Sequence, residues 1–262
     1  MTQPPPPGVD PNVPNVARIY DYHLGGKDNF AADRAAAEQM TALFPDVRNA
    51  ARENRAFLAR TVHCLVDAGV RQIVDIGSGL PTQGNVHEIA HALAPDCKVV
   101  YVDYDPVVVS HGQALLGRGE NVEVVRADLR DVDDLLTAVS GEIDFDKPVA
   151  FLLFAILHFL HEADKPYEVV ARLRDVSAPG SYLALSHATE SMPEIIGDAL
   201  EIYRKATASL ALRSHAEILG FFDGYELLDP GLVYPRDWRP DADEIFPNTS
   251  VSIGFGGIGR KL

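Results

Sequence analysis

The sequence predicts an α/β protein built on a doubly wound, mostly parallel sheet with an antiparallel last strand. From residue 71 onward, short apolar runs alternate with helical patterns, which is typical of parallel strands joined by crossover helices. The first run ends in a glycine turn and the second in an acid, as at the ligand-binding edge of such sheets. The last two runs have no helix between them, so we expect them to pair antiparallel and close one edge.

Composition limits the classes of partner. At 262 residues and 47% hydrophobic content, the chain can form one substantial domain. A formal net charge of −15 repels phosphate backbones and anionic lipid, so we expect no nucleic-acid and no membrane partner. Cys64 and Cys97 belong to no C-x-x-C motif, so we predict no disulfide framework and no metal site. The longest apolar run, residues 149–160, is too short to cross a bilayer, and no signal pattern opens the chain, which predicts a cytoplasmic protein.

The first 69 residues differ from the rest. Residues 1–14 carry six prolines and are expected to form a disordered or extended arm. The pattern of residues 16–24 predicts a short helix that Gly25 and Gly26 stop. Helices are also predicted over 31–43 and 46–68. We therefore expect residues 15–69 to form a helical extension and residues 70–262 to form the ligand-binding core.

Within the core, strands and helices are predicted in strict alternation. The strands are expected at 72–76, 98–103, 122–126, 148–154 and 181–186. The helices between and after them are expected at about 85–94, 106–116, 131–139, 166–176 and 193–209. A short helix opens with the capping box Ser214-x-x-Glu217, and two strands at 225–228 and 249–255 end the chain. Right-handed crossovers bring the ligand-binding turns to the carboxyl ends of the strands.

The glycine turn after the first strand predicts the kind of nucleoside. Asp75 precedes Gly77, Ser78 and Gly79, and the loop that follows lacks the G-x-G-x-x-G spacing that holds a diphosphate. A carboxylate in this turn suits a ligand with an ammonium group, such as the methionine half of S-adenosylmethionine. The same carboxylate disfavours the diphosphate of a nicotinamide dinucleotide, which stays open as an alternative ligand.

Two further acids follow the next strands. Asp103 ends the second strand and is the candidate for binding both ribose hydroxyls, while Tyr104 could stack on adenine. Asp105 is a competitor for the ribose role or a helix cap before Pro106. After the third strand, Asp128 is placed to meet the exocyclic amine of adenine, with the alternative that it is a turn residue.

The exit of the fourth strand should face the ligand through Phe154 and Ala155. His158 is a candidate general base there, with the alternative of a packed, hydrogen-bonded histidine. His161 and His187 are weaker candidates.

The segment around residues 20–30 is unusually dense in polar and aromatic side chains. Tyr22, Lys27 and Asn29 are candidate cofactor contacts in a segment that closes the site, and Tyr22 is also a candidate catalytic residue. The alternative is a capped helix with surface polar groups. Tyr234 and Trp238, from a late proline-rich loop, are further candidate walls.

The motifs D-I-G-S-G, V-D-Y-D-P, R-A-D-L and A-I-L-H-F-L resemble the successive motifs of class I S-adenosylmethionine-dependent methyltransferases. More narrowly, Y-D-Y-H-L-G-G-K-D-N-F and D-I-G-S-G-L-P-T-Q-G-N-V-H-E resemble an actinobacterial S-adenosyl methyltransferase family. The resemblance implies a seven-stranded, Rossmann-like methyltransferase fold and S-adenosyl-L-methionine as cofactor. It implies cofactor roles for Asp75, Gly77, Gly79, Asp103 and Asp128, with Leu129 beside the last. Pro81 departs from the class pattern, where a third glycine often falls.

The leading hypothesis is therefore methyl transfer to an unidentified acceptor, expected to be a small molecule. Holding the nucleophile and the methyl group in line in a dry site can supply much of the rate, so a strong base is not required. The alternatives are a module that binds S-adenosylmethionine or S-adenosylhomocysteine without turnover, and an NAD-dependent oxidoreductase. The sequence names no acceptor.

Overall fold

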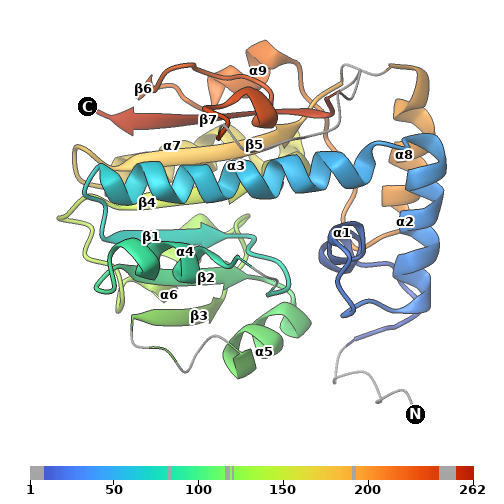
Figure 1. The fold of residues 1–262 in the computed structure, drawn as a ribbon, viewed down its shortest axis with the longest axis horizontal. Helices are drawn as coiled ribbons and strands as arrows, with labels where there is room; N and C mark the ends of the chain where they lie inside the picture. The colour runs from blue at the N-terminus through green and yellow to red at the C-terminus, as the bar shows by residue number, and fades with distance from the viewer. Residues whose placement is uncertain (1–8, 82–83, 116–118, 120, 191–192, 242–251) are drawn as a thin grey trace.

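The fold is a seven-stranded sheet with helices on both faces (Figure 1). The structure is a computed structural model that describes residues 9–81, 84–115, 119, 121–190, 193–241 and 252–262. The strand order is β3-β2-β1-β4-β5-β7-β6. Strands β1 to β5 pair parallel, and β7 runs antiparallel between β5 and β6. The predicted doubly wound sheet with an antiparallel last strand is confirmed.

The observed strands are β1 (Gln72–Ile76), β2 (Lys98–Asp103), β3 (Val122–Arg126), β4 (Ala150–Phe154), β5 (Tyr182–Ala188), β6 (Tyr225–Leu227) and β7 (Gly254–Lys261). The α-helices are α1 (Val16–Leu24), α2 (Ala31–Leu43), α3 (Val47–Asp67), α4 (Val86–Leu93), α5 (Pro106–Leu115), α6 (Val132–Val139), α7 (Pro166–Val176), α8 (Pro193–Arg204) and α9 (His215–Gly220). The described residues also include the short 3-10 turns η1 (Leu157–Phe159), η2 (Glu162–Asp164) and η3 (Pro235–Asp237).

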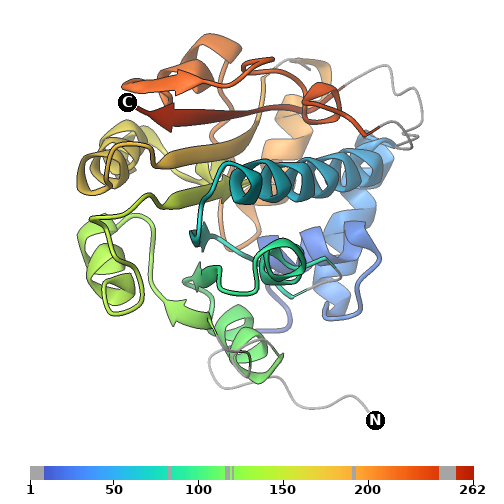
Figure 2. The same cartoon turned by 60° about the vertical axis from the view of Figure 1, so that its left-hand side comes forward.

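Two hydrophobic layers fill the space between sheet and helices. Alternate side chains of each strand point to opposite faces, so Ile73 and Leu152 join one layer while Val74 and Phe151 join the other. Helices α3, α4 and α5 supply the first layer, and α6, α7 and α9 supply the second. Figure 2 shows α3 and α4 on one side of the sheet and α6 and α7 on the other.

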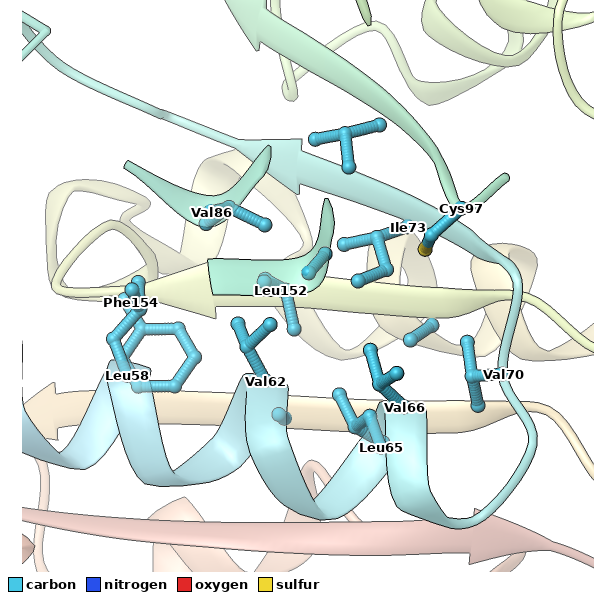
Figure 3. Packing of buried hydrophobic residues seen from close by; sticks show 14 of the residues in the cluster. Leu58, Val62, Leu65, Val66, Val70, Ile73, Val86, Cys97, Leu152 and Phe154 are labelled. Carbon is cyan, nitrogen blue, oxygen red and sulfur yellow. The ribbon is translucent and has the colours of Figure 1, made fainter. Parts of the chain in front are cut away.

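Helix α3 is part of the same core as the sheet. Its residues Leu58, Val62, Leu65 and Val66 are buried against strand residues such as Leu152 (Figure 3). This apolar stripe at helical spacing removes large side chains from water, at about 25 cal/mol per Å² of apolar area. The second half of α3 therefore covers the sheet, while its first half reaches past the carboxyl ends of the strands (Figure 1).

Helices α1, α2 and α8 lie beyond the carboxyl ends of the parallel strands (Figure 1). The side chain of Asn15 caps α1 by accepting from the N–H groups of Ala17 and Arg18. Arg18 Nε lies 2.7 Å from Asp33 Oδ2, and this buried ion pair joins α1 to α2. Gly25, in the left-handed region at φ 86°, ends α1 as predicted. These contacts hold the helices over the edge of the sheet where ligands bind in this class of fold.

The last strand lies later in the chain than predicted. We expected it at 249–255, whereas β7 spans Gly254–Lys261, and residues 249–251 lie outside the described part. Its four glycines hide the strand from a pattern search, because glycine has low strand propensity. They are needed for packing: a Cβ at Gly256 would lie 2.3 Å from Phe57 Cε1, and one at Gly259 would lie 2.8 Å from Phe222 Cδ1.

The predicted helix over 193–209 is also shorter in the structure. Helix α8 ends at Arg204, after which Lys205 and Ala206 donate to carbonyls three residues back. Thr207 N then donates to Pro14 O at 3.0 Å. After α8, the chain therefore contacts the N-terminal arm at Pro14. Residues 1–8 of the predicted arm lie outside the described part.

Candidate cofactor and acceptor cavity

A cavity of about 260 Å³ lies at the carboxyl ends of β1, β2, β4 and β5 and extends under α1, α2, α3 and α8. It gathers nine of the residues predicted for the site: Asp75, Gly77, Ser78, Gly79, Asp103, Tyr104, Phe154, Ala155 and His158. The crossover topology brings these residues together although they span more than eighty positions in the chain.

The glycine turn is shaped by its neighbours. Gly77 has φ 72°, and a Cβ there would lie 2.6 Å from Ile156 Cγ1, so the β4 exit packs directly on this turn. Gly79 has φ 67° with open space beside its Cα. Only glycine takes both conformations without strain, and the second position leaves backbone exposed to a ligand.

Asp103 is buried at the end of β2 and is held by backbone. Its carboxylate accepts from Gly79 N at 3.1 Å and from Asp105 N at 3.0 Å. Burial raises the pKa of Asp103 to about 6, and these two N–H groups oppose the shift. The carboxylate is thus oriented toward the cavity, in the position expected for a diol-binding acid.

Asp105 is a cap. Its Oδ1 accepts from Val107 N at 2.7 Å, at the start of α5, and its Oδ2 accepts from the side chain of Asn15. The predicted alternative of a helix cap is the arrangement found. The Asn15 contact also ties the start of α1 to the acid that adjoins Asp103.

Asp75 and Arg55 both line the cavity, and the positive charge of Arg55 acts on the carboxyl group of Asp75. Asp75 is 4% exposed and has no hydrogen-bond partner among the described residues. Burial raises its pKa to about 7, Arg55 opposes the shift, and Asp103 adds to it. Arg55 donates from Nη2 to Gly84 O at 3.2 Å, while its buried Nε has no partner among the described residues. A buried acid and a half-buried guanidinium, each with hydrogen-bonding capacity left over, could together satisfy a zwitterionic group.

The β4 exit turns sharply at Ala155. This residue has φ 52°, an uncommon conformation for a residue with a Cβ, and its N–H donates to Ser186 Oγ at 3.0 Å and to Ser186 O at 3.1 Å. The strained turn is followed directly by Ile156, whose side chain packs against Gly77.

His158 is hydrogen-bonded at one nitrogen only. Its Nδ1 accepts from Ala188 N at 3.2 Å, and Nε2 has no partner among the described residues. Burial lowers the pKa of His158 well below its usual value, with His187 and Arg213 adding to the shift, so the ring is neutral at pH 7. A neutral ring that accepts at Nδ1 carries its proton on Nε2. His158 therefore offers the cavity a donor, not the free lone pair that a general base needs.

Arg213, which carries no motif in the sequence, organises this turn. The buried guanidinium donates to Leu157 O at 3.2 Å, to Leu160 O at 3.0 Å and to His187 Nε2 at 3.0 Å. His187 in turn donates from Nδ1 to Ala188 O at 2.6 Å. His161 lies outside this group, with its Nε2 2.8 Å from Ser209 Oγ at the surface.

Five predicted cofactor contacts do not line the cavity: Asp128, Leu129, Tyr22, Lys27 and Asn29. Asp128 is paired with Arg130, which lowers the pKa of its carboxyl.

Leu129 is buried in the second hydrophobic layer. Tyr22 donates to Glu38 Oε1 at 3.2 Å and carries Arg48 over its ring, while Lys27 is exposed. Asn29 donates to Asp21 Oδ2 at 2.9 Å, so it supports a residue that does line the cavity.

The late-loop aromatic residues are structural as well. Trp238 is fully buried and its ring centroid lies 5.5 Å from that of Phe57. Tyr234 stacks on Phe255 with centroids 4.9 Å apart. Neither residue lines the cavity, so the expectation of late-loop walls is wrong for both; Phe255 and Pro235 lie at the wall instead.

Several cavity residues were not predicted. Asp21, Glu53, Asn54 and Arg55 come from α1 and α3, and only their alternation with apolar positions could have indicated an inward face. The acid of Asp21 accepts from Asp28 N at 3.1 Å. A Cβ at Gly26 would lie 1.9 Å from Asp21 Oδ1. The G-G-K-D-N segment therefore packs around this buried carboxylate.

The sheet order, the glycine turn after β1 and the buried acid after β2 define a nucleoside-binding fold of the methyltransferase type. Residues 2–262 match the family model described as S-adenosyl methyltransferase. The chain therefore belongs to the S-adenosyl methyltransferase family and is a methyltransferase.

Solved structures agree with this assignment. A Thermobifida fusca protein that is provisionally assigned as a methyltransferase is 41% identical, with a TM-score of 0.91 over 99% of both chains. A DUF574 family protein from Streptomyces avermitilis is 37% identical, with a TM-score of 0.91 over 97% of this chain and 99% of that chain. The N-methyltransferase NodS from Bradyrhizobium japonicum, solved with S-adenosylhomocysteine, shares the fold at 12% identity and a TM-score of 0.51, over 81% of this chain and 87% of that chain.

Across the described part of the chain, no helix combines the length and apolar character needed to span a membrane. Within the same residues, no cluster of three His, Cys, Asp or Glu side chains could hold a metal ion.

Proposed function

We propose that the chain transfers the methyl group of S-adenosylmethionine to a small-molecule acceptor inside the cavity described above. The observation that carries the cofactor assignment is the pair of Asp75, a buried acid, and Arg55, a half-buried guanidinium whose Nε has no partner among the described residues; both line the cavity together with the glycine turn. An ammonium on Asp75 and a carboxylate on Arg55 satisfy both groups at once. A diphosphate would face the carboxylates of Asp75 and Asp103, so the dinucleotide alternative is disfavoured.

The remaining residues fit an adenosine. Asp103, already oriented by Gly79 N, is assigned to the ribose diol, and Tyr104 to a face of the adenine ring. The backbone at Gly79, where nothing lies within 4 Å of the place a Cβ would take, permits close approach of the ligand. Support comes from the shared fold of the N-methyltransferase NodS, whose structure contains S-adenosylhomocysteine.

The residues of the chain enclose the cofactor and the acceptor and orient them for the reaction. When bound, the cofactor supplies a methyl carbon to which a lone pair of the acceptor bonds while the carbon–sulfur electron pair stays on sulfur. Residues of α1, α2 and α8 line the cavity together with the glycine turn, so we assign to the N-terminal extension the role of excluding water from the reacting atoms. The hydrogen bond from the Asn15 side chain to Asp105 holds the N-terminal extension in this position.

The test is calorimetry with S-adenosylmethionine, S-adenosylhomocysteine, 5′-methylthioadenosine and NAD. We expect the first two to bind tightly and 5′-methylthioadenosine, which lacks the amino-acid half, to bind at least tenfold more weakly. Arg55→Met should remove most of that difference, and Arg52→Met, on the exposed side of α3, is the matched control. Binding of NAD alone would refute the assignment.

A second candidate is a sensor that binds the cofactor without turnover. Transfer of label from methyl-tritiated S-adenosylmethionine into extracts of cells lacking the protein separates the two. Labelled product supports the enzyme, and tight cofactor binding with persistent absence of label supports the sensor.

A further inference from the structure

One part of the cavity wall, called here the second half, is mostly apolar. Its lining residues are Met40 from α2, Phe44 directly after α2, Leu58 from α3, Phe159 after β4, and Tyr203 from α8. The rings of Phe159 and Tyr203 lie 6.0 Å apart between centroids. Such walls favour a compact apolar or aromatic ligand.

Most of the ionisable side chains that line the cavity, among the described residues, are acids. The described lining includes the five acids Asp21, Glu53, Asp75, Asp103 and Asp105, and Arg55 is its only lysine or arginine. Of these acids, Glu53 has Arg236 at 3.9 Å. Burial lowers the pKa of His23 and of His187 to about 4, so neither ring adds positive charge at pH 7. An anionic acceptor would be repelled by these carboxylates, and Arg55 is engaged by the proposed cofactor.

His158 lines the same cavity, and three contacts hold its ring and its backbone. Ala188 N donates to His158 Nδ1 at 3.2 Å, which leaves the proton of the neutral ring on Nε2. Ala211 N donates to His158 O at 2.7 Å, and Arg213 Nη1 donates to Leu157 O at 3.2 Å. The ring and the backbone that carries it are therefore both held, with one N–H left to donate.

We propose that this half binds an uncharged, largely apolar acceptor and that His158 Nε2–H donates a hydrogen bond to an oxygen or nitrogen lone pair of that molecule. This inference rests on the proposed function and specifies the substrate class of the same cavity. His158 is then a binding and orienting residue that selects acceptors carrying a hydrogen-bond acceptor. The general-base role considered for it from the sequence does not follow from this geometry.

The first test needs no ligand. Nitrogen-15 NMR of the full chain with labelled histidine distinguishes protonated from unprotonated ring nitrogens, and the His158→Gln variant identifies the signals by their loss. We expect one proton, on Nε2, at pH 7. A proton on Nδ1 instead, or on both nitrogens, would overturn the assignment.

The second test uses three probes of one shape: acetophenone, ethylbenzene and benzoate. Binding is measured by ligand titration in the protein saturated with S-adenosylhomocysteine. Acetophenone should bind roughly threefold to tenfold more tightly than ethylbenzene, because a neutral hydrogen bond contributes about that ratio, and benzoate should bind most weakly.

Variants separate the donor from the shape of the side chain. His158→Met removes the donor and should abolish the preference for acetophenone, whereas His158→Gln keeps an N–H near the Nε2 position and should retain part of it. His161→Ala, at an exposed histidine, is the control and should change neither ratio. Equal binding of acetophenone and ethylbenzene, preference for benzoate, or no binding of any probe would each overturn the proposal. Failure of S-adenosylhomocysteine to bind would count against the proposed function, and the NMR result would still decide the state of His158.

Discussion

Arg213 Nη1 lies 3.0 Å from His187 Nε2, and because a guanidinium can only donate, that nitrogen carries no proton. The proton of the neutral ring is then on Nδ1, where it is donated to Ala188 O at 2.6 Å. One buried cation thus sets the tautomer of His187 and holds the turn that presents His158.

Arg213→Met should destabilise the protein by at least about 2 kcal/mol, because it leaves Leu157 O, Leu160 O and His187 Nε2 without their donor. Urea denaturation measures the loss. Arg172→Met removes a guanidinium that is paired with Asp133 at the surface and is the control, with an expected change within about 0.5 kcal/mol. Equal effects of the two variants would contradict the role given to Arg213.

Asp103→Asn should weaken binding of S-adenosylhomocysteine by at least about 1.5 kcal/mol, roughly tenfold, since it removes charge-assisted bonds to a diol. The amide also presents an NH₂ group to Gly79 N or Asp105 N, both of which are donors. Calorimetry at constant pH measures the change. Asp96→Asn, whose side chain is 76% exposed, should bind as the unmodified protein does.

The pKa of Asp75 gives a pH dependence with a definite sign. Its folded-state pKa of about 7 lies above the usual value of 3.8, so the folded chain holds this proton more tightly than the unfolded chain does. The contribution of Asp75 to stability is present below about pH 4 and is lost as pH rises toward 7.

Asp75→Asn should therefore raise the free energy of unfolding of the ligand-free protein at pH 8, by no more than about 4 kcal/mol, with a gain that shrinks toward pH 4. The same variant should bind S-adenosylhomocysteine more weakly, because the partner of the ammonium is gone. Denaturation at both pH values, with calorimetry at pH 8, checks the pair of effects. A gain that does not depend on pH would show that ionisation of Asp75 is not its source.

Asn15 has two tasks that substitution can separate. Asn15→Ala loses the α1 cap and should cost about 1 kcal/mol of stability, while Asn15→Ser keeps a capping oxygen and should cost less. Neither side chain reaches Asp105, so both variants should weaken S-adenosylhomocysteine binding threefold to tenfold. Asn12→Ala, at an exposed position in the same arm, should change neither quantity.

Gly256→Ala should destabilise the protein by several kcal/mol, because the new methyl group would lie 2.3 Å from Phe57 Cε1 in a close-packed layer. Gly141→Ala, where nothing lies within 4 Å of the added carbon, should stay within about 1 kcal/mol of the unmodified protein. Thermal denaturation compares the two, and similar melting temperatures would mean that the layer can move apart.

Much of this architecture could be read from the sequence because its signals are local. The glycine turn at Gly77 and Gly79 and the acid at Asp103 follow strongly apolar strands, so their placement at one sheet edge follows from topology. The glycine-rich β7 escaped the pattern, because its strand character comes from its neighbours and not from its own side chains.

The cavity residues on α1 and α3 could not be predicted in the same way. Arg55 looks like any surface arginine of an amphipathic helix until α3 is placed across the carboxyl ends of the strands. Conversely, Asn29 and Tyr22 stand in a distinctive motif, yet their contacts are with Asp21 and Glu38. A dense polar motif can serve to bury one carboxylate, and only the tertiary structure distinguishes that from ligand binding.

The lack of a side chain at Gly256 affects the shape of the cavity. Phe57 occupies the room that a Cβ would take, and its ring lies 5.2 Å from that of Phe154, which lines the cavity. The depth available to an acceptor is therefore set partly by Gly256, which acts on the cavity through Phe57 and Phe154. Family members that differ at this glycine or at Phe57 should accept molecules of different size with the same glycine turn and the same acids.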